Sequence, residues 1–153
     1  MAANGLAWVL DGLASRLGGA SAEPGLANEE IRSALAGLER ALADAYGMVR
    51  RRWEGLDSSV LHTLQMRHLT RADQLRSAGG VKAPITAAPA RPEARPAATA
   101  RADVEALLAD VETLRRIYER AMLRGARPPS LLADLYAALA TDRAELLQLR
   151  SVA

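Results

Sequence analysis

The sequence lacks cysteine and phenylalanine and has few other aromatic residues, with two Trp and three Tyr among 153 residues. Without cysteine there is no disulfide, no thiolate nucleophile and no thiolate metal site. With so few aromatic side chains, the core has to be built from Leu, Ala and Val, which suits close-packed helices better than a sheet. No stretch alternates apolar and polar residues as a half-buried strand does. The sequence therefore predicts an all-α fold.

The chain also lacks a strong charge excess and a long apolar run. Its formal net charge is +2, and residues 1–77 and 101–153 each hold equal numbers of Arg and acidic residues. Proteins that bind phosphate backbones usually have a basic excess in their folded part, so nucleic acid is an unlikely partner. No run approaches the roughly 18 residues of a transmembrane helix, and the first residues do not form a signal peptide. We expect a cytoplasmic location.

A heptad seam organises the first half of the chain. Its apolar residues recur in steps of four and three, then seven, at Ile31, Leu35, Leu38, Leu42, Ala45, Val49 and Leu56. Such a seam has to be buried against other helices. Asn28 stands where an N-cap belongs, so we predict a helix over 28–54, about 40 Å long at 1.5 Å per residue. Gly55 is expected to end it; the alternative is one helix over 28–77.

A second helix is predicted to begin with Asp57 or Ser58 as its cap and to end near Ser77. The heptad pattern returns after Arg101, at Val104, Leu107, Val111, Leu114, Tyr118 and Ala121. Gly125 is expected to end this third helix. Ser130 is expected to cap a fourth, whose seam positions are Leu132, Leu135, Leu139, Asp142, Leu146 and Leu149.

These elements predict three segments. Residues 1–77 hold a short amphipathic helix over 5–17 and a helical hairpin, and residues 101–153 hold a second hairpin. Residues 78–100 contain four of the seven prolines and are expected to form an Ala/Pro-rich linker. Two heptad-patterned hairpins most simply form one four-helix bundle. The alternative is an open hairpin that completes its core on another chain.

Two charged residues, Arg52 and Asp142, fall on predicted seam positions. An unpaired buried charge is costly, so each needs a partner or water. We predict that the two lie near opposite ends of the seam or pair with each other.

The two histidines, His62 and His68, are six residues apart, which is about 240° around a helix. They therefore cannot bind one metal ion together. Neither has a Glu three residues before it, as the Glu-x-x-His motif of di-iron bundles requires, and we predict no metal site. His68 lies on the apolar face and is expected to be a hydrogen-bonded core residue.

The run Leu61-His62-Thr63-Leu64 resembles the phosphorylated helix of histidine phosphotransfer domains, which are also four-helix bundles. The resemblance covers four residues and implies phosphotransfer through His62. Those domains carry a lysine and a glycine just after the Leu, where this sequence has Gln65 and Met66. Ser58 lies one turn before His62, but nothing nearby supplies an oriented base or an oxyanion hole. We therefore predict no enzyme activity and no cofactor.

The most suggestive polar pattern is a stripe of arginines on one face of the third helix and just after it, at Arg116, Arg120, Arg124 and Arg127. Arg67 and Arg71 form a shorter stripe on the second helix. One interpretation is a solvated face that pairs with Glu112 and Glu119. The other is a docking surface for an acidic partner, because the guanidinium fork suits carboxylates and phosphates.

We therefore expect a non-catalytic helical protein-binding module, such as an adaptor, an assembly factor, a secretion chaperone or an accessory subunit. Its partner would be another protein, or a second copy of the chain joined through the helical seams. One alternative is a nucleic-acid-binding protein that uses the arginine stripes. The other is a phosphotransfer bundle that uses His62.

Overall fold

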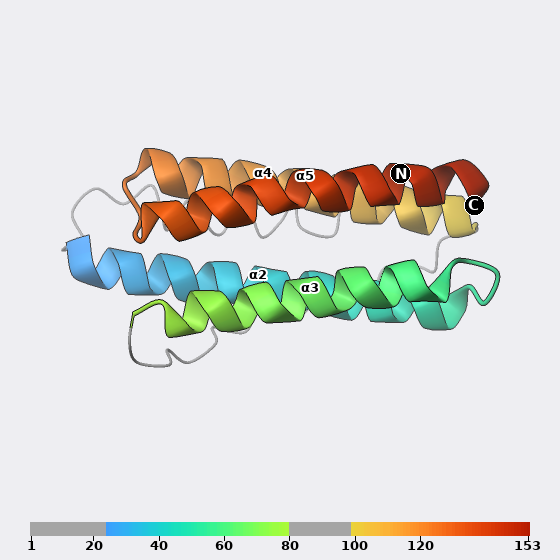
Figure 1. The fold of residues 1–153 in the computed structure, drawn as a ribbon, viewed down its shortest axis with the longest axis horizontal. Coiled ribbons are helices and arrows are strands. Elements are labelled where there is room, and N and C mark those ends of the chain that lie inside the picture. Colours follow the sequence, from blue (N-terminus) through green and yellow to red (C-terminus); the bar gives the residue numbers. More distant parts are fainter. Residues whose placement is uncertain (1–23, 80–98) are drawn as a thin grey trace.

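In the part of the chain that the computed structural model describes, residues 24–79 and 99–153, four helices pack as a bundle (Figure 1). They are α2 (Pro24–Arg52), α3 (Ser58–Ser77), α4 (Ala100–Leu123) and α5 (Pro129–Val152). The prediction of an all-helical bundle is confirmed. None of these helices has an apolar stretch that could cross a membrane. The predicted helix over 5–17 and most of the predicted linker over 78–100 lie outside the described residues.

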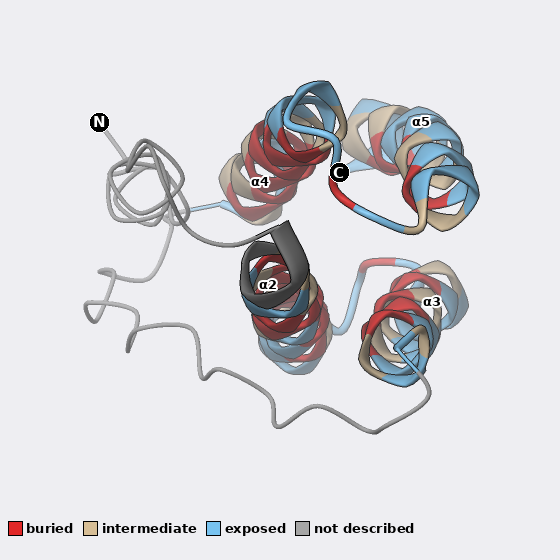
Figure 2. Cartoon of the chain, turned by 90° about the vertical axis from the view of Figure 1, so that its left-hand side faces the viewer, coloured by how far each residue is buried: buried red, intermediate tan, exposed pale blue. Residues whose placement is uncertain are grey.

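The helices form two layers, with α2 beside α3 and α4 beside α5 (Figure 1). Seen along the bundle, α4 lies against α2 and α5 lies near α3 (Figure 2). Neighbouring helices run in opposite directions. The two helices of each layer are packed closely, whereas α3 and α5 make the fewest contacts of the neighbouring pairs. The side of the bundle between α3 and α5 is therefore its most open side.

The start of α2 differs from the prediction. The helix begins at Pro24, four residues before Asn28, because proline fits a first helical turn, where its missing N–H leaves no bond unmade. The Asn28 side chain has another role: its Oδ1 accepts a 3.0 Å bond from the backbone N–H of Arg127. Arg32 Nη1 donates to the backbone carbonyl of Arg127 at 3.2 Å. Together these side chains hold the α4–α5 loop against α2.

A loop separates α2 from α3, so residues 28–77 do not form one continuous helix. Asp57 is the N-cap of α3, as predicted. Its Oδ1 accepts bonds from the Ser59 hydroxyl at 2.9 Å and from the backbone N–H groups of Ser59 and Val60 at 3.0 and 3.2 Å. These bonds, the Ser59 hydroxyl first, lower the pKa of the Asp57 carboxyl below its ordinary value.

Gly125 ends α4 in the way the sequence predicts. It has a φ of 74°, a left-handed conformation that only glycine adopts without strain. The N–H of Gly125 donates to the Met122 carbonyl at 2.9 Å, and that of Ala126 donates to the Ala121 carbonyl at 3.0 Å. This pair of bonds is a Schellman motif. Ala126 is buried, so the turn also closes the end of the core.

Helix α5 does not begin with Ser130 as its N-cap, which differs from the prediction. Pro128 occupies the cap position, Pro129 is the first helical residue, and no side-chain cap bond is present. The reason is again that a proline ring is preorganised for the first turn of a helix. At the start of α4, by contrast, Thr99 Oγ1 accepts a 3.1 Å bond from the Ala102 N–H.

Most of the buried side chains are aliphatic, and they come from all four helices. The predicted apolar seam positions of α2, α4 and α5 are buried, and so is the charged Asp142, whereas Arg52, the other charged residue predicted on a seam, is exposed. The most buried large side chains include Leu35, Leu38, Leu42, Leu61, Leu64, Leu75, Leu107, Leu114, Leu132 and Leu139. The core is thus leucine-based, as the scarcity of aromatic residues requires.

The turn at Gly125 gives a first testable prediction. Gly125→Ala should lower the free energy of unfolding by about 1 kcal/mol, because an alanine is strained at positive φ. Gly55→Ala is the matched control: nothing lies within 4 Å of the added methyl group and its φ is not positive. Urea unfolding followed by circular dichroism measures both variants. Equal stability of the two would contradict the assigned turn.

Candidate functional site

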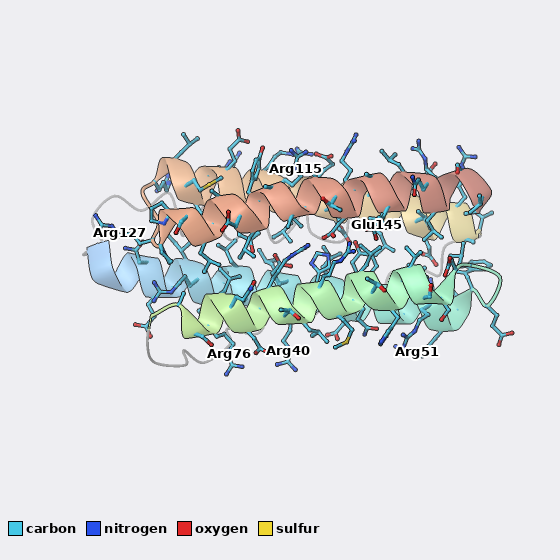
Figure 3. The ribbon with its side chains drawn as sticks, viewed as in Figure 1. Arg40, Arg51, Arg76, Arg115, Arg127 and Glu145 are labelled. Atoms are coloured by element: carbon cyan, nitrogen blue, oxygen red, sulfur yellow. The ribbon has the colours of Figure 1, made fainter. Side chains whose placement is uncertain are left out.

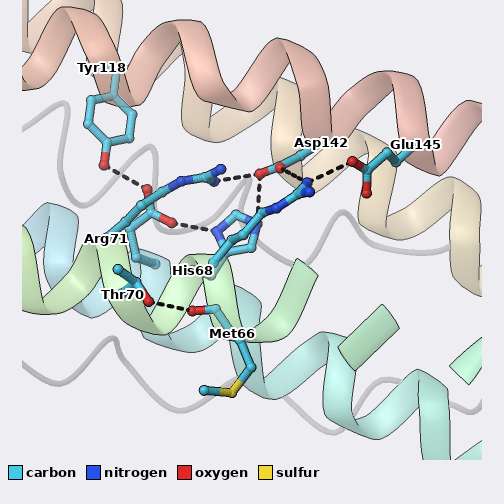
Figure 4. Close-up of polar contacts among 9 residues, drawn as sticks. Met66, His68, Thr70, Arg71, Tyr118, Asp142 and Glu145 are labelled. Carbon is cyan, nitrogen blue, oxygen red and sulfur yellow. Dashed lines mark hydrogen bonds and ion pairs between the residues drawn. The ribbon is translucent and has the colours of Figure 1, made fainter. Parts of the chain in front are cut away.

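A polar network crosses the centre of the bundle and takes residues from every described helix (Figure 4). Its members are Glu39 of α2, His68 and Arg71 of α3, Tyr118 of α4 and Asp142 of α5, and all five are buried. Charged side chains are seldom buried unless they are paired. We therefore ask, for each charged group of this network, which group it is paired with.

Glu39 joins three helices. Its Oε1 accepts a 2.6 Å bond from the Tyr118 hydroxyl, and its Oε2 lies 2.5 Å from His68 Nδ1. Both carboxylate oxygens are thus bonded, which offsets the cost of removing the charge from water. Burial, together with the negative charge of Glu39, raises the pKa of the Tyr118 hydroxyl well above its ordinary value. Tyr118 therefore acts as a hydrogen-bond donor.

Asp142 joins α5 to α3. Its Oδ2 accepts a 2.5 Å bond from Arg71 Nη1, and its Oδ1 lies 3.4 Å from Arg67 Nη1. Arg67 also donates to Glu145 at 2.7 Å, and this bond raises the pKa of the Arg67 guanidinium. Burial lowers the pKa of Arg71, but the bond to Asp142 and its negative charge outweigh that effect and raise it. Both arginines are held as cations.

His68 lies between the two carboxylates. Its Nδ1 faces Glu39, and its Nε2 is 3.4 Å from Asp142 Oδ2. The ring stacks on Tyr46 with centroids 5.2 Å apart and planes inclined by 24°. Burial, and then the charge of Asp142, raises the pKa of the Tyr46 hydroxyl. The prediction that His68 is a hydrogen-bonded core residue is confirmed.

Arg52 and Asp142, the two predicted seam charges, are both paired, but not with each other. Arg52 Nη1 donates to Asp103 Oδ2 at 2.9 Å, and Trp53 Nε1 donates to the same oxygen at 2.6 Å. These bonds connect the end of α2 and the start of the α2–α3 loop to the first turn of α4. Arg52 is exposed, so the prediction that it occupies a buried seam position is wrong; Asp142 is buried, and its pairing offsets the cost of burying a charge.

The network is suited to holding helices together. Its members are shielded from solvent, and most of their donors and acceptors are bonded to one another. His68 Nε2 is an exception: it has no hydrogen-bond partner within the described residues and lies 3.4 Å from Asp142 Oδ2. In the described part of the chain, no three His, Cys, Asp or Glu side chains are grouped so that they could hold a metal ion.

An open groove lies between α3 and α5, with a volume of about 580 Å³; we call it the α3–α5 groove. Its lining includes aliphatic, hydroxyl, amide and charged side chains: His62, Thr63, Met66, Arg67, Thr70, Arg71 and Gln74 of α3, and Leu131, Asp134, Leu135 and Ala138 of α5. The two arginines of its wall are those that bind Asp142. The groove therefore adjoins the central network.

The prediction that Arg67 and Arg71 form an exposed docking stripe on α3 is wrong for Arg71. Arg71 is buried and bonded to Asp142, so it is not part of an exposed docking face. Arg67 leaves 38% of its side chain exposed, yet it is bonded to Asp142 and Glu145. The sequence showed only that the two arginines share a helical face, and not that acidic residues of α5 lie opposite them.

The arginines at the end of α4 differ from those of α3. Arg116, Arg120 and Arg124, which we call the α4 stripe, are all exposed, and none has an ion pair within the described residues. Glu112, one of their two expected partners, instead pairs with Arg115 at 3.5 Å and with Arg143. Glu119, the other, is exposed and forms no ion pair within the described residues.

Arg127, the fourth arginine of the predicted stripe, lies beyond α4 at the end of the bundle where α2 begins (Figure 3). Its side chain is exposed, while its backbone is held by Asn28 and Arg32. It is therefore separate from the helical part of the stripe.

His62 is exposed at one end of the α3–α5 groove. Its Nδ1 lies 2.7 Å from Arg50 Nη1 of α2. Phosphotransfer through this histidine stays a prediction.

Comparisons of the chain with protein-family models, with curated proteins and with solved structures found no match. The function is therefore argued from the residues alone.

The central network gives a second prediction. Asp142→Ala should lower the free energy of unfolding by about 3–5 kcal/mol, because it leaves the buried Arg71 charge without its partner. Asp134→Ala, an exposed position on the same helix, should change it by less than about 0.5 kcal/mol. Chemical denaturation of both variants is the measurement. A small effect at Asp142 would show that the charge of Arg71 is compensated elsewhere.

The two buried tyrosines give a third prediction. Tyr118→Phe removes the bond to Glu39 and should cost about 1.5–3 kcal/mol, the usual contribution of a hydrogen bond to a charged group. Tyr46→Phe makes the same change at an equally buried ring whose hydroxyl has no hydrogen-bond partner among the described residues. It should leave the stability unchanged or raise it. Thermal unfolding of the pair tests the assignment, and equal losses would contradict it.

Proposed function

We propose that this protein is a non-catalytic helical binding module that docks an acidic surface of a protein partner on its α4 stripe. The observation that carries the proposal is the exposure of Arg116, Arg120 and Arg124 without an ion pair in the described part of the chain. An adaptor, an assembly factor, a secretion chaperone and an accessory subunit all fit this description. The cytoplasmic location stays a prediction.

The charge pattern of the stripe favours an acidic partner. Like charges four residues apart on a helix repel one another, and no acid among the described residues forms an ion pair with the α4 stripe. Carboxylates of a partner would remove it, and each guanidinium can form two parallel bonds with one carboxylate. The stripe would thus contribute both affinity and orientation.

An apolar side chain lies within the same surface. Leu123 is 83% exposed, and it falls three residues after Arg120 and seven after Arg116, which places it on their face of the helix. Arginine and large apolar residues together are typical of protein–protein interfaces. This combination favours a protein partner over a polyanion, for which the leucine would add little.

The non-catalytic part of the proposal rests on where the reactive residue types lie. His68, Glu39 and Asp142 are bonded to one another or to Arg71 in the interior, so they are committed to holding the helices. The remaining histidine, His62, has an arginine as its bonded neighbour, and an arginine is not a general base. These residues support a binding role.

The fourth prediction tests the stripe. The double variant Arg120→Glu/Arg124→Glu should bind a protein partner at least about tenfold more weakly, because two attractive contacts become repulsive. The double variant Arg40→Glu/Arg51→Glu is the matched control. It makes the same charge change at exposed positions of α2 (Figure 3) and should bind as the parent protein does.

The partner would first be recovered by a tagged pull-down from the native host, with its stoichiometry measured, and its affinity for the three proteins then determined by calorimetry. Equal affinities for the stripe variant and the control would contradict the proposal. Recovery of nucleic acid, bound with an affinity that falls steeply with salt, would favour the nucleic-acid alternative instead.

A further inference from the structure

The α3–α5 groove exists because this side of the bundle is joined by charges. Arg67 and Arg71 reach Asp142 of α5 at 3.4 and 2.5 Å, and α3 and α5 make fewer contacts than the other neighbouring helices do. Beside these ion pairs, Met66 and Leu131 remain partly uncovered. The groove thus presents aliphatic side chains at a place where neighbouring helices are usually in contact.

We propose that the α3–α5 groove binds one amphipathic helix of a protein partner. The groove follows α3 from His62 to Gln74 and α5 from Leu131 to Ala138. At 1.5 Å per residue these walls are about 18 Å and about 10 Å long, so the longer wall spans a little over three helical turns. A helix laid in such a groove buries apolar residues at i, i+3, i+4 and i+7 and keeps its polar face in water. This site goes beyond the docking of an acidic surface on the α4 stripe.

The side chains of the groove suit an aliphatic stripe. Met66 is 47% exposed, and a methionine is flexible and polarizable enough to pack against leucines of varied shape. Leu131 and Ala138 of α5 also line the groove and are half-buried, and Leu135, a further lining residue, is buried. Three hydroxyl or amide side chains, Thr63, Thr70 and Gln74, line the α3 wall.

The two ends of the groove carry opposite charge, which sets the direction of the bound helix. At one end, His62 is in contact with the Arg50 guanidinium at 2.7 Å. At the other end, where α5 begins, Asp134 is exposed and has no ion pair within the described residues. A bound helix with a lysine in its first turn near Asp134 and a glutamate in its last turn near Arg50 would match both ends.

The helix macrodipole favours the same direction, because its positive N-terminal end would lie beside Asp134. The bound helix would therefore run parallel to α5. An open groove of this length leaves one side of its occupant in water, which suits the polar face of a helix. A second copy of the chain fits less well, since it would place one concave surface against another.

The groove and the α4 stripe share no residue, because the groove is lined by residues of α3 and α5 and the stripe lies on α4. Loss of binding at one would leave the other intact, so the two proposals can fail separately.

The test uses the full chain and two synthetic helical peptides of about fourteen residues, each with one leucine stripe. The first has Lys in its first turn and Glu in its last turn, and the second has these residues exchanged. Fluorescence anisotropy should give a Kd of about 10 µM for the first peptide and a value at least about tenfold higher for the second. Asp134→Lys should remove or reverse this preference.

A tryptophan at the groove locates the binding site. Ala138→Trp fills the α5 wall and should weaken binding of the first peptide at least about tenfold. Ala140→Trp places the same side chain at an exposed position of α5 outside the groove and should bind as the parent does. Thr70→Trp, from the exposed α3 wall, repeats the test if Ala138→Trp fails to fold.

Four results would overturn the proposal, three of them with the peptides and one with the protein alone. The first is equal binding of both peptides, and the second is binding that neither tryptophan in the groove weakens. The third is no binding of either peptide at about 1 mM, which is weaker than a helix-in-groove contact should be. A dimer in sedimentation that Ala138→Trp dissociates would assign the groove to a second copy of the chain and would also overturn it.

Discussion

The ion pair between Arg71 and Asp142, with His68 beside it, is the constraint on which the bundle depends. A buried charge without a partner costs several kcal/mol, so helices α3 and α5 have to meet in the register that brings these side chains to 2.5 Å. Glu39 extends the same constraint to α2 and α4 through His68 and Tyr118. Aliphatic packing supplies the driving force for folding, but leucines alone tolerate several registers. The polar network can form in only one register of the helices.

That constraint also shapes the surface. Arginine side chains are long, and two of them span the distance from α3 to Asp142, so α3 and α5 need not approach as closely as α2 and α3 do. The α3–α5 groove is the consequence. A polar link that fixes the interior therefore leaves aliphatic side chains uncovered next to it.

Much of the local structure could be predicted from the sequence, because its causes are local. The Asp57 cap and the Gly125 turn depend on neighbouring residues, and the burial of His68 follows from its place in the apolar pattern. The prediction that Asn28 is an N-cap is wrong, because an Asn side chain can cap a helix or bond to distant backbone, and here it bonds to that of Arg127. The partners of Arg71 and Glu39 could not be predicted, because they lie on other helices. Asp142 is 71 residues from Arg71, and His68 is 29 residues from Glu39. The groove depends on distances between helices, which periodicity does not encode.

Two pairs of arginines show why spacing alone does not identify a binding surface. Arg67 and Arg71 on α3 have the same four-residue spacing as Arg116 and Arg120 on α4, and both pairs look like solvated stripes in the sequence. In the fold, Asp142 and Glu145 lie opposite the first pair and neutralise it. The second pair is exposed, and Glu112, one of its two expected partners, is paired with Arg115 and Arg143. An arginine stripe favours an external acid only where the fold leaves it uncompensated, and in the described part of this chain that condition holds on α4.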